Sequence, residues 1–569
     1  MPIDLNILIG GTAGQGVHSI TAPLAKALMR QGCWVLAAQS YESRIRGGHL
    51  FNTVRVADQR LVSSREGVDL LIALNQETVD LHRPEILSQG LIIYDASEVK
   101  QVPGDIPALA LTPESLLPGA AGKAEIAVNA GACGAALGLL RASLDPLIAL
   151  LKETFGDKGS EVVEWNVQAA TRGYEQGAGL KFSFSLAGIT PPPGPRLLIN
   201  GHEAMALGAL AGGLQFISGY PMTPWTSLLN AVAQRAPRYN VVVEQAEDEI
   251  AAINLALGAS YTGARSLTGT SGGGFCLMTE ALGLAAMTET PLVIVMSMRP
   301  GPSTGLPTRT SQGDLGFVLY AGQDDSPRAV LAPGTPAQGF TLMAKALNLA
   351  DRYQVPVFLL TDQYFADTQF TQLPGEFPEI QVDRALTTGP AATPYERYAY
   401  TPDGVSPRRL PGFGPELVVA DSDEHTPDGH LTEDLEVRVK MHDKRLRKLQ
   451  ALEQELGGIT TAGDPDAPLT LMCWGSSLGP VQEAVALLKA DQTPARMVHL
   501  SELWPFPQAA VAAALKGSKK LVLVEMNASG KLHRLLRQET GIKADHLMLK
   551  YDGAPFTPEY ILRDLAPVI

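Results

Sequence analysis

The sequence predicts three α/β domains, each built around a parallel sheet, and two observations support this fold class. Short apolar runs of strand length alternate with helical patterns along most of the chain. These runs are almost continuously apolar, as expected for strands in sheets that are covered on both faces. With 569 residues, the chain is also too long for a single hydrophobic core.

The first predicted domain covers residues 1–188 and is followed by a Pro-rich linker, 189–199. The linker contains Thr190-Pro191-Pro192-Pro193-Gly194-Pro195, and repeated proline favours an extended chain. Ile20–Gln31 has the pattern of a helix. The runs that predict strands in this domain are Ile3–Ile9, Trp34–Ala38, Leu70–Leu74 and Leu91–Tyr94.

The strand and helix pattern then restarts twice. The second predicted domain covers residues 200–369, and the third covers 465–569. Between them, residues 370–464 predict an irregular excursion followed by a charged helix, Leu431–Leu456, which we interpret as a solvated helix or a subunit arm. The predicted strands of the two domains are Leu214–Ser218, Val241–Glu244, Arg265–Gly269, Leu292–Met296, Ala329–Leu331, Val357–Leu360, Leu469–Trp474, Ala495–His499 and Lys520–Val524.

The composition excludes several classes of partner. A net charge of −14 and a pI near 5.3 argue against nucleic acids and anionic membrane surfaces. No apolar run reaches the roughly 18 residues that a membrane span needs, and no basic region precedes the first apolar strand, so we expect a cytoplasmic protein. The four cysteines lie far apart in apolar contexts, which predicts buried thiols, no metal site and no iron–sulfur cluster on this chain alone.

Two motifs in the second domain follow neighbouring predicted strands. The first is Gly219-Tyr220-Pro221-Met222-Thr223-Pro224, a rigid turn that presents the Thr223 hydroxyl. The second is an acidic cluster containing Glu244, Glu247, Asp248 and Glu249, which opens an Ala-rich helix. The carboxyl ends of parallel strands form the edge where α/β sheets bind ligands. A carboxylate beside an apolar helix start is partly desolvated, which suits proton exchange with a cofactor.

The first domain contains a glycine-rich loop, Gly10–Gly16, between a predicted strand and a predicted helix. Its free backbone N–H groups are suited to phosphate binding. The spacing is G-x-x-G-x-G and differs from the dinucleotide-binding pattern. The following segment, Gln39–His49, adds more glycines and the cations Arg44 and Arg46. A phosphorylated ligand other than a nicotinamide and a tight turn without any ligand both fit these residues.

Taken in order, these motifs resemble the 2-oxoacid:ferredoxin oxidoreductases, specifically a large subunit in which the gamma domain is fused ahead of the alpha part. The resemblance covers most of the chain. It rests on G-x-A-G-Q-G, Gln39–Gly48, Tyr-Pro-Met-Thr-Pro, Glu-Asp-Glu-Ile-Ala-Ala and Gly301–Thr308, the last of which resembles the 2-oxoglutarate branch. It implies a coenzyme A-binding gamma-type domain, a pyrimidine-binding domain for thiamine diphosphate, and a transketolase C-terminal-like domain with an assembly role.

The resemblance also implies roles for single residues. Glu249 would hydrogen-bond the aminopyrimidine of thiamine diphosphate, with Glu247 as its competitor and Glu244 a distant third. Thr223 would contact the substrate, and Arg299 would pair with a substrate carboxylate. Further implied residues are Gly11, Thr12, Gly14, Gln15, Gly16, Ser40, Tyr41, Arg44, Gly47 and Gly48 for coenzyme A, Tyr220, Pro221, Ser271 and Gly272 for thiamine diphosphate, and Ser303 and Thr304 for the substrate.

Two signatures of a complete thiamine enzyme are missing from the sequence. There is no Gly-Asp-Gly with a downstream Asn for Mg²⁺ and diphosphate, and no Cys-x-x-Cys for a cluster. Within the resembled family, both belong to a separate, smaller beta subunit. The resemblance therefore implies an incomplete enzyme whose partner carries Mg²⁺ and a four-iron four-sulfur cluster, which passes electrons to ferredoxin, in an expected dimer of heterodimers.

The implied reaction converts 2-oxoglutarate, coenzyme A and oxidised ferredoxin into succinyl-coenzyme A, carbon dioxide and reduced ferredoxin. Its reversal would fix CO₂ in a reductive TCA cycle. The residues leave three alternatives open. These are the same family acting on pyruvate, branched-chain or aryl 2-oxoacids, a non-oxidative thiamine enzyme such as a decarboxylase or transketolase, and a non-catalytic scaffold subunit.

Overall fold

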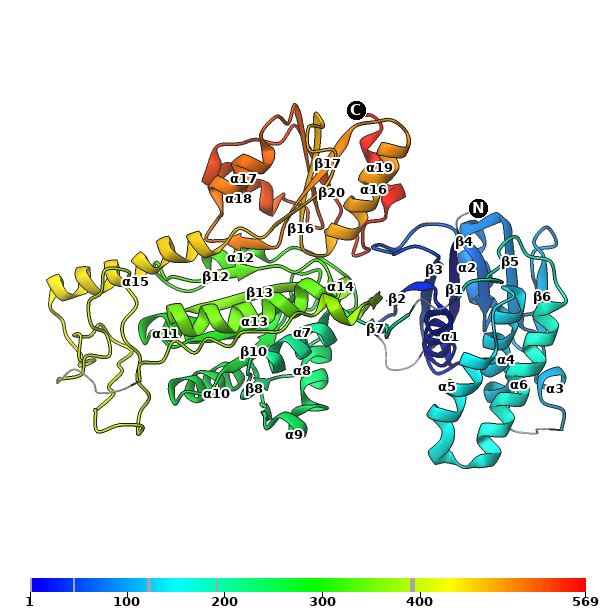
Figure 1. Ribbon diagram of the computed structural model, residues 1–569, viewed down its shortest axis with the longest axis horizontal. Helices are drawn as coiled ribbons and strands as arrows, with labels where there is room; N and C mark the ends of the chain where they lie inside the picture. Colours follow the sequence, from blue (N-terminus) through cyan, green and yellow to red (C-terminus); the bar gives the residue numbers. More distant parts are fainter. Residues whose placement is uncertain (1–2, 44–46, 120–123, 191–192, 389–393) are drawn as a thin grey trace. The chain divides into compact units, whose positions relative to one another are not determined.

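The structure is a computed structural model that describes residues 3–43, 47–119, 124–190, 193–388 and 394–569 (Figure 1). Three sheets with helices on their faces confirm the predicted α/β class. The described chain forms two compact units. The first comprises residues 1–199, 368–376 and 557–559, and the second comprises the remainder.

The sheet of the first unit is mixed, whereas the sequence predicted a parallel one. Its strand order is β6-β5-β4-β1-β3-β2-β14-β7, and β3 runs antiparallel to both β1 and β2. The prediction missed β3 because two polar residues, Asn52 and Arg55, interrupt its apolar pattern. Both are nonetheless buried, and Arg55 pairs with Asp4 on β1. The bounds are β1 Asp4–Thr12, β2 Trp34–Ser40, β3 His49–Ala57, β4 Val68–Ala73, β5 Ile86–Asp95, β6 Ala108–Leu111, β7 Leu197–Ile199 and β14 Gln369–Gln372.

Two short strands at the edge of this sheet differ from the prediction. Leu197–Ile199 (β7) lies in the predicted linker, and Gln369–Gln372 (β14) lies where the second domain was expected to end. They pair with each other, and β14 also pairs with β2. Val35 and Thr371 exchange hydrogen bonds across this junction. Such pairings between distant segments leave no local pattern in the sequence.

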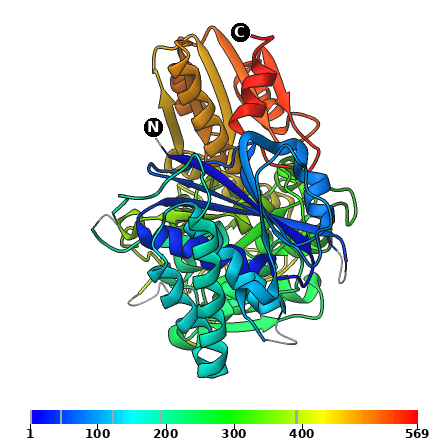
Figure 2. The ribbon, with the colours of Figure 1, turned by 90° about the vertical axis from the view of Figure 1, so that its right-hand side faces the viewer.

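Helices cover both faces of the first sheet. On one face α4 and α6 pack side by side (Figure 2). Their contact needs glycine, because a Cβ at Gly134 would lie 1.9 Å from the backbone oxygen of Ala170. On the other face, Val79 of α2 packs in a separate apolar cluster. The bounds are α1 Val17–Gln31, α2 Gln76–His82, α3 Pro113–Leu116, α4 Ala124–Leu139, α5 Asp145–Phe155 and α6 Ser160–Ala178.

The second sheet has the order β18-β12-β13-β11-β10-β8-β9 and is parallel except for β18. Alternate residues of β11 enter two different cores: Ile294 packs toward α10 and α11, and Val293 toward α7, α8 and α13. The sheet is therefore covered on both faces, as its apolar strands predicted. The bounds are β8 Phe216–Gly219, β9 Val242–Gln245, β10 Ser266–Thr270, β11 Leu292–Met298, β12 Ala329–Leu331, β13 Pro356–Asp362, β18 Glu502–Trp504, α7 Gly201–Ala211, α8 Thr226–Ala233, α9 Ala236–Tyr239, α10 Glu249–Tyr261, α11 Gly272–Met287, α12 Leu315–Tyr320, α13 Pro336–Tyr353 and α14 Gln363–Asp367.

The third sheet has the order β15-β17-β16-β19-β20. Helices α16 and α19 cover one face, and α17 and α18 the other (Figure 1). It begins earlier than the predicted boundary at residue 465, because Ile459–Gly463 (β15) pairs with β17. The remaining bounds are β16 Leu469–Trp474, β17 Ala495–Leu500, β19 Lys520–Glu525, β20 His546–Leu549, α16 Leu478–Ala490, α17 Gln508–Leu515, α18 Lys531–Thr540 and α19 Pro558–Leu565.

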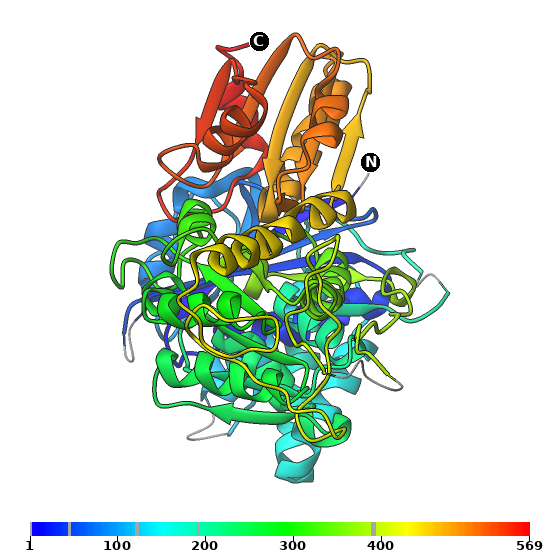
Figure 3. The same ribbon diagram turned by 90° about the vertical axis from the view of Figure 1, so that its left-hand side faces the viewer.

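The charged helix is present as α15, Leu435–Glu455 (Figure 3). One of its faces is buried, so its interpretation as a solvated helix is wrong for that face. The Lys444 and Lys448 side chains are fully buried and pair with Glu289. The sequence pattern does not indicate this burial, because a lysine that pairs with a remote carboxylate has the same spacing along a helix as a lysine exposed to solvent.

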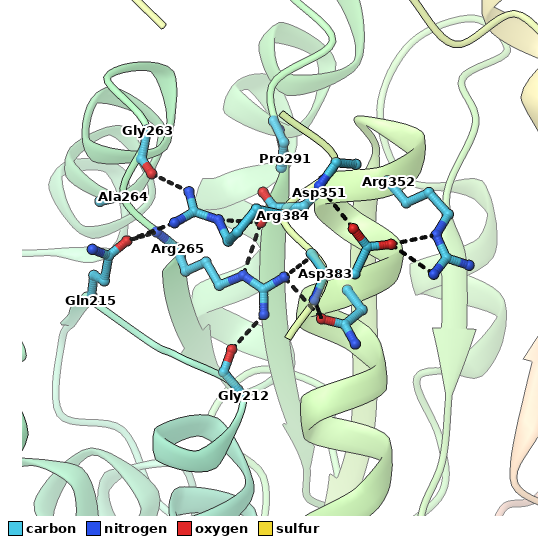
Figure 4. Close-up of polar contacts among 12 residues, drawn as sticks. Gly212, Gln215, Gly263, Ala264, Arg265, Pro291, Asp351, Arg352, Asp383 and Arg384 are labelled. Atoms are coloured by element: carbon cyan, nitrogen blue, oxygen red, sulfur yellow. Dashed lines mark hydrogen bonds and ion pairs between the residues drawn. The ribbon is translucent and has the colours of Figure 1, made fainter. Parts of the chain in front are cut away.

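Residues 377–434 are irregular in their described part, as predicted, apart from two isolated bridges. A buried carboxylate, Asp351 on α13, fixes this excursion. It accepts hydrogen bonds from Arg265 Nε at 2.9 Å, Arg384 Nε at 3.0 Å and Arg408 Nη1 at 3.1 Å. Figure 4 shows the first two contacts together with the neighbouring Arg352–Asp383 pair.

Three of the four cysteines are buried, but Cys276 on α11 is exposed, contrary to expectation. Its apolar sequence context comes from neighbours on the buried face of the helix. Among the helices of the described residues, none has both the length and the apolar character that crossing a membrane requires.

Candidate functional site

The turn after β8 is anchored by Trp225. This side chain is fully buried, and its ring lies against Gly219 and Gly269. A Cβ added at Gly219 would lie 2.9 Å from the ring, and a Cβ added at Gly269 would lie 2.3 Å from it, so both positions need glycine. Tyr220 is exposed, and Pro221 and Thr223 are half-buried. The Thr223 carbonyl accepts a hydrogen bond from Arg299 Nη1 at 2.7 Å. The turn after β8 is thus hydrogen-bonded to the residue that follows β11.

The acidic residues at the end of β9 and just after it have different surroundings. Asp248 caps α10 by accepting a hydrogen bond from the Ala251 amide at 2.8 Å. Glu249 follows and is only 3% exposed, and its Oε1 has no hydrogen-bond partner among the described residues. Glu244 and Glu247 are exposed. A buried oxygen without a partner is rare in native proteins and is expected where a ligand belongs.

The start of α11 lies against Glu249. A Cβ at Gly274 would lie 2.3 Å from Glu249 Oε1, so glycine is required for this approach. Ser271, at the N-terminal cap of α11, is fully buried, and its hydroxyl also has no hydrogen-bond partner among the described residues. The two unpartnered oxygens fit a ligand that carries both donor and acceptor groups, as an aminopyrimidine ring does.

A cavity of about 440 Å³ lies beside these residues. Four predicted site residues line it, namely Gly272, Arg299, Ser303 and Thr304. Met222, Gly301 and Pro302 belong to motifs that the sequence analysis singled out. Sequence reasoning missed Cys276, Asp314 and Phe317, because neither the exposed face of α11 nor the short α12 carries a recognisable motif. The full lining is Met222, Gly272, Gly273, Cys276, Arg299, Gly301, Pro302, Ser303, Thr304, Asp314 and Phe317.

Burial perturbs two charged groups in this cavity. It lowers the pKa of the Arg299 guanidinium, and it raises the pKa of the Asp314 carboxyl to about 6, against the opposing effect of Lys531. Ser303 adopts a left-handed backbone conformation with φ of 56°, a strained geometry that is common in functional loops. The cavity therefore combines one cation, one titratable acid and a constrained loop.

The third sheet fixes the loop between β11 and α12. Gln312 is fully buried in this loop. Its Nε2 donates to the Trp474 carbonyl at 2.7 Å, and its Oε1 accepts from the Met526 amide at 2.9 Å. The Thr310 amide donates to the Gly553 carbonyl at 3.1 Å. The C-terminal part of the chain thus sets the position of the cavity wall.

In the first unit, the predicted ligand segments converge at one sheet edge. Thr12 at the end of β1 pairs with His49, and Ser40 at the end of β2 pairs with Phe51. The glycine loop, Ser40, Tyr41, Gly47 and Gly48 therefore lie at neighbouring strand ends, and Arg44 lies outside the described residues.

Side chains support the glycine loop from within. Gln15 Oε1 accepts from the Thr12 amide at 2.7 Å and from Asn75 Nδ2 at 3.2 Å. Gly14 and Gly16 have φ values of 98° and 87°, which favour glycine. Gly11 is buried against Leu74 and Val17. The result is a shaped loop at a helix start, which is typical of phosphate sites.

Comparisons with known families agree with this architecture. The model for pyruvate ferredoxin/flavodoxin oxidoreductase matches residues 6–176, and the thiamine diphosphate-binding model of pyruvate flavodoxin/ferredoxin oxidoreductase matches residues 207–444. Residues 467–559 match core domain II of pyruvate:ferredoxin oxidoreductase. Fold and matches together define an oxidoreductase polypeptide with a thiamine diphosphate-binding domain.

The chain belongs to the 2-oxoacid:ferredoxin oxidoreductase family, which confirms the resemblance seen in its motifs. It is 31% identical to subunit alpha of 2-oxoacid:ferredoxin oxidoreductase 2 from Aeropyrum pernix, over 97% of this chain and 96% of that one. It is 34% identical to the 2-oxoglutarate synthase subunit KorA from Methanothermobacter thermautotrophicus, over 64% of this chain and 96% of that one.

A solved structure is similar over the whole length. The 2-oxoglutarate:ferredoxin oxidoreductase from Magnetococcus marinus, with 2-oxoglutarate, coenzyme A and succinyl-CoA bound, has a TM-score of 0.91 and 33% identity over 99% of each chain.

Proposed function

We propose that this chain is the large subunit of a 2-oxoglutarate:ferredoxin oxidoreductase. In this proposal it interconverts 2-oxoglutarate, coenzyme A and oxidised ferredoxin with succinyl-coenzyme A, carbon dioxide and reduced ferredoxin. The buried Glu249 oxygen without a partner, beside a cavity lined by Arg299, carries the proposal for a thiamine enzyme. The likeness to a structure that binds 2-oxoglutarate, coenzyme A and succinyl-CoA supports this choice of substrate.

The residues of the second sheet fit the pyrimidine half of a thiamine site. Glu249 is buried, and its unpartnered Oε1 would hydrogen-bond the aminopyrimidine. Ser271 would contact the same ring, and Gly272 would allow its close approach. Tyr220 and Pro221 would shape the adjoining turn. When bound, thiamine diphosphate supplies the nucleophilic carbon and the electron sink for decarboxylation.

The cavity residues would bind and orient the 2-oxoacid. Arg299 would pair with the carboxylate next to the oxo group, and its bond to the Thr223 carbonyl fixes the guanidinium. The Thr223 hydroxyl would donate to the same end of the substrate. The Ser303 and Thr304 hydroxyls, on the strained loop, would donate hydrogen bonds to the remainder of the 2-oxoacid. Glu247 is exposed, which favours Glu249 as the acid of the cofactor site.

The first unit would bind coenzyme A, whose diphosphate suits a glycine loop at a helix start. Gln15 accepts from the Thr12 amide and from Asn75, and these bonds fix the loop from within. The amides of Gly14 and Gly16 would then be the ones that donate to phosphate oxygens. The convergence of this loop with Ser40, Tyr41, Gly47 and Gly48 supports one extended site. We retain Arg44 in this site on the resemblance alone.

A smaller beta subunit would complete the enzyme with Mg²⁺, the diphosphate site and the four-iron four-sulfur cluster. Large exposed apolar side chains on β9 and on two helices support such a partner: Val242 is 58%, Ile250 50% and Leu277 49% exposed. Val242 lies on the edge strand β9, and the other two lie on the neighbouring helices α10 and α11. Such a group of exposed apolar residues is typical of an interface. We propose a dimer of heterodimers in the cytoplasm.

The test is to isolate the chain with its partners from its own cells and to measure viologen reduction with 2-oxoglutarate and with pyruvate. The proposal expects a smaller iron–sulfur subunit and reduction on 2-oxoglutarate that depends on coenzyme A. Exchange of labelled CO₂ into 2-oxoglutarate would support the CO₂-fixing direction of a reductive TCA cycle. A chain isolated alone, without dye reduction, would refute the proposed function.

A further inference from the structure

Asp314 contributes the carboxyl group of the 440 Å³ cavity. It precedes α12, and its side chain makes no capping hydrogen bond to that helix. A Cβ at Gly272 would lie 3.0 Å from Asp314 Oδ2, so the carboxyl group lies over the start of α11. An acid with this position faces the same space as Arg299 and Ser303.

The fold fixes the position of this acid. Gln312, two residues earlier, is held by the Trp474 carbonyl and the Met526 amide. On the other side, Val318 of α12 donates from its amide to the Asp314 carbonyl at 3.0 Å. Because the backbone is held on both sides, Asp314 cannot withdraw far from a ligand in the cavity.

Three titratable or charged groups of the described residues accompany it. Arg299 from the end of β11 and Cys276 from α11 line the same cavity, and Lys531 at the start of α18 lies beside Gly316 of α12. A Cβ at Gly316 would lie 3.8 Å from Lys531 Nζ. Burial raises the pKa of Asp314 to about 6 and Lys531 opposes this rise, so the carboxyl changes charge within the range where enzymes are assayed.

We infer that Asp314 is a specificity-determining residue of this cavity, and that a dicarboxylic 2-oxoacid binds there with uptake of a proton by Asp314, whereas a monocarboxylic 2-oxoacid does not. The inference rests on the proposed function. A second substrate carboxylate beside an ionised Asp314 would place two like charges in a partly desolvated space. A protonated Asp314 would instead donate a hydrogen bond to that carboxylate.

The test uses the purified complex and compares kcat/KM for 2-oxoglutarate with kcat/KM for pyruvate between pH 6 and 8.5. Ionisations that affect both substrates cancel in this ratio. Because the carboxyl loses its proton as the pH rises, the ratio should fall by about tenfold per pH unit above the pKa of Asp314. A ratio that does not change with pH would overturn the inference.

Variants sharpen the test. Asp314→Asn stays neutral, so its ratio should be independent of pH and exceed that of the unmodified enzyme by about tenfold or more at pH 8. Lys531→Gln removes the opposing cation and should move the fall of the ratio to higher pH. Asp325→Asn changes an exposed acid outside the cavity and should keep the original profile. Equal losses for both substrates in Asp314→Asn would contradict the inference.

A binding measurement separates this inference from the proposed function. Calorimetric titration with 2-oxoglutarate in buffers of different ionisation enthalpy counts the protons taken up, whether or not turnover occurs. Turnover of neither acid would refute the proposed function. Binding of 2-oxoglutarate without proton uptake at pH 7.5 would refute the role of Asp314, even in an active enzyme.

Discussion

Gly274 leaves the space that the Glu249 carboxyl group occupies. A Cβ at this position would lie 2.3 Å from Glu249 Oε1 and 2.1 Å from Thr270 Oγ1. Neither side chain has open space to move into, because Glu249 and Thr270 are both buried and Thr270 lies on β10. The start of α11 and the start of α10 are therefore fitted to each other around one carboxyl group.

Gly274→Ala should displace Glu249 and reduce kcat by about 100-fold, the loss expected when a reacting group is misplaced by about 1 Å. Viologen reduction by the purified complex measures this effect. Gly283→Ala is the matched control in the same helix, because its added Cβ would meet only the Gln323 side-chain amide, at 3.2 Å. Equal activities of the two variants would contradict the close fit between the helices.

Glu249→Gln should lower kcat by about 100-fold or more, because the amide cannot exchange a proton with the cofactor. Its side chain has nearly the same volume, so the midpoint of thermal unfolding should change little. Glu247→Gln alters an exposed acid two residues away and should leave kcat unchanged. The reverse order of effects would assign the proton-sharing role to Glu247.

The sequence contained enough information for strands whose side chains are apolar on both faces. The predicted strand Ala329–Leu331 coincides with β12, which is entirely buried. Strand β3 was missed because its buried Arg55 is neutralised by Asp4, a residue on another strand. Buried Lys444 was misjudged for the same reason, since its partner Glu289 is remote in sequence. Local patterns do not record the partner that makes a buried charge tolerable.

The site shows the same division. Motifs identified Arg299, Ser303 and Gly272, and all three line the cavity. Asp314 belongs to no recognisable motif, and it reaches the cavity because its carboxyl group lies against the start of α11. The contribution of the third sheet through Gln312 depends on contacts with residues far along the chain. Tertiary contacts, rather than spacing, bring these residues to the site.

Gln312→Leu should destabilise the protein by about 2–4 kcal/mol, because the Trp474 carbonyl and the Met526 amide would be buried without partners. It should also raise KM for the 2-oxoacid, since the loop that carries Asp314 and Ser303 loses its support. Chemical unfolding and steady-state kinetics measure the two effects. Gln338→Leu, which removes bonds on α13 away from the cavity, serves as the control. Unchanged KM in Gln312→Leu would show that the loop holds its position without this clamp.

Gly16→Ala should weaken coenzyme A binding by about tenfold or more, since backbone strain of about 1–3 kcal/mol would be imposed on the loop. The residue has a φ of 87°, and an added Cβ would lie 2.0 Å from Asn129 Nδ2. Calorimetric titration with coenzyme A measures the affinity. Gly104→Ala, in open space in the same unit, should bind normally. Normal binding by Gly16→Ala would place coenzyme A elsewhere.

Glu289 is the buried carboxylate that holds α15 in place. Lys444 Nζ lies 2.6 Å from its Oε1, and Lys448 pairs with its other oxygen. Although burial alone would raise the pKa of Glu289, the charges of Lys448, Lys444 and Arg397 hold it below its usual range. The stabilisation from this carboxylate is therefore complete above about pH 4.5, its ordinary pKa, and is lost as the pH falls further.

Glu289→Gln should destabilise the protein by about 3–5 kcal/mol at pH 7, because two buried ammonium groups would lose their counter-charge. Urea unfolding monitored by circular dichroism measures the change. Replacing Glu289, Lys444 and Lys448 together by Met removes all three charges and should restore most of the lost stability, because an apolar cluster of similar volume needs no counter-charge. If the triple variant were less stable than Glu289→Gln, these residues would hold α15 in place by specific hydrogen-bond geometry rather than by charge balance. Changing the exposed pair Glu436 and Lys440 on the same helix should alter stability by less than about 1 kcal/mol.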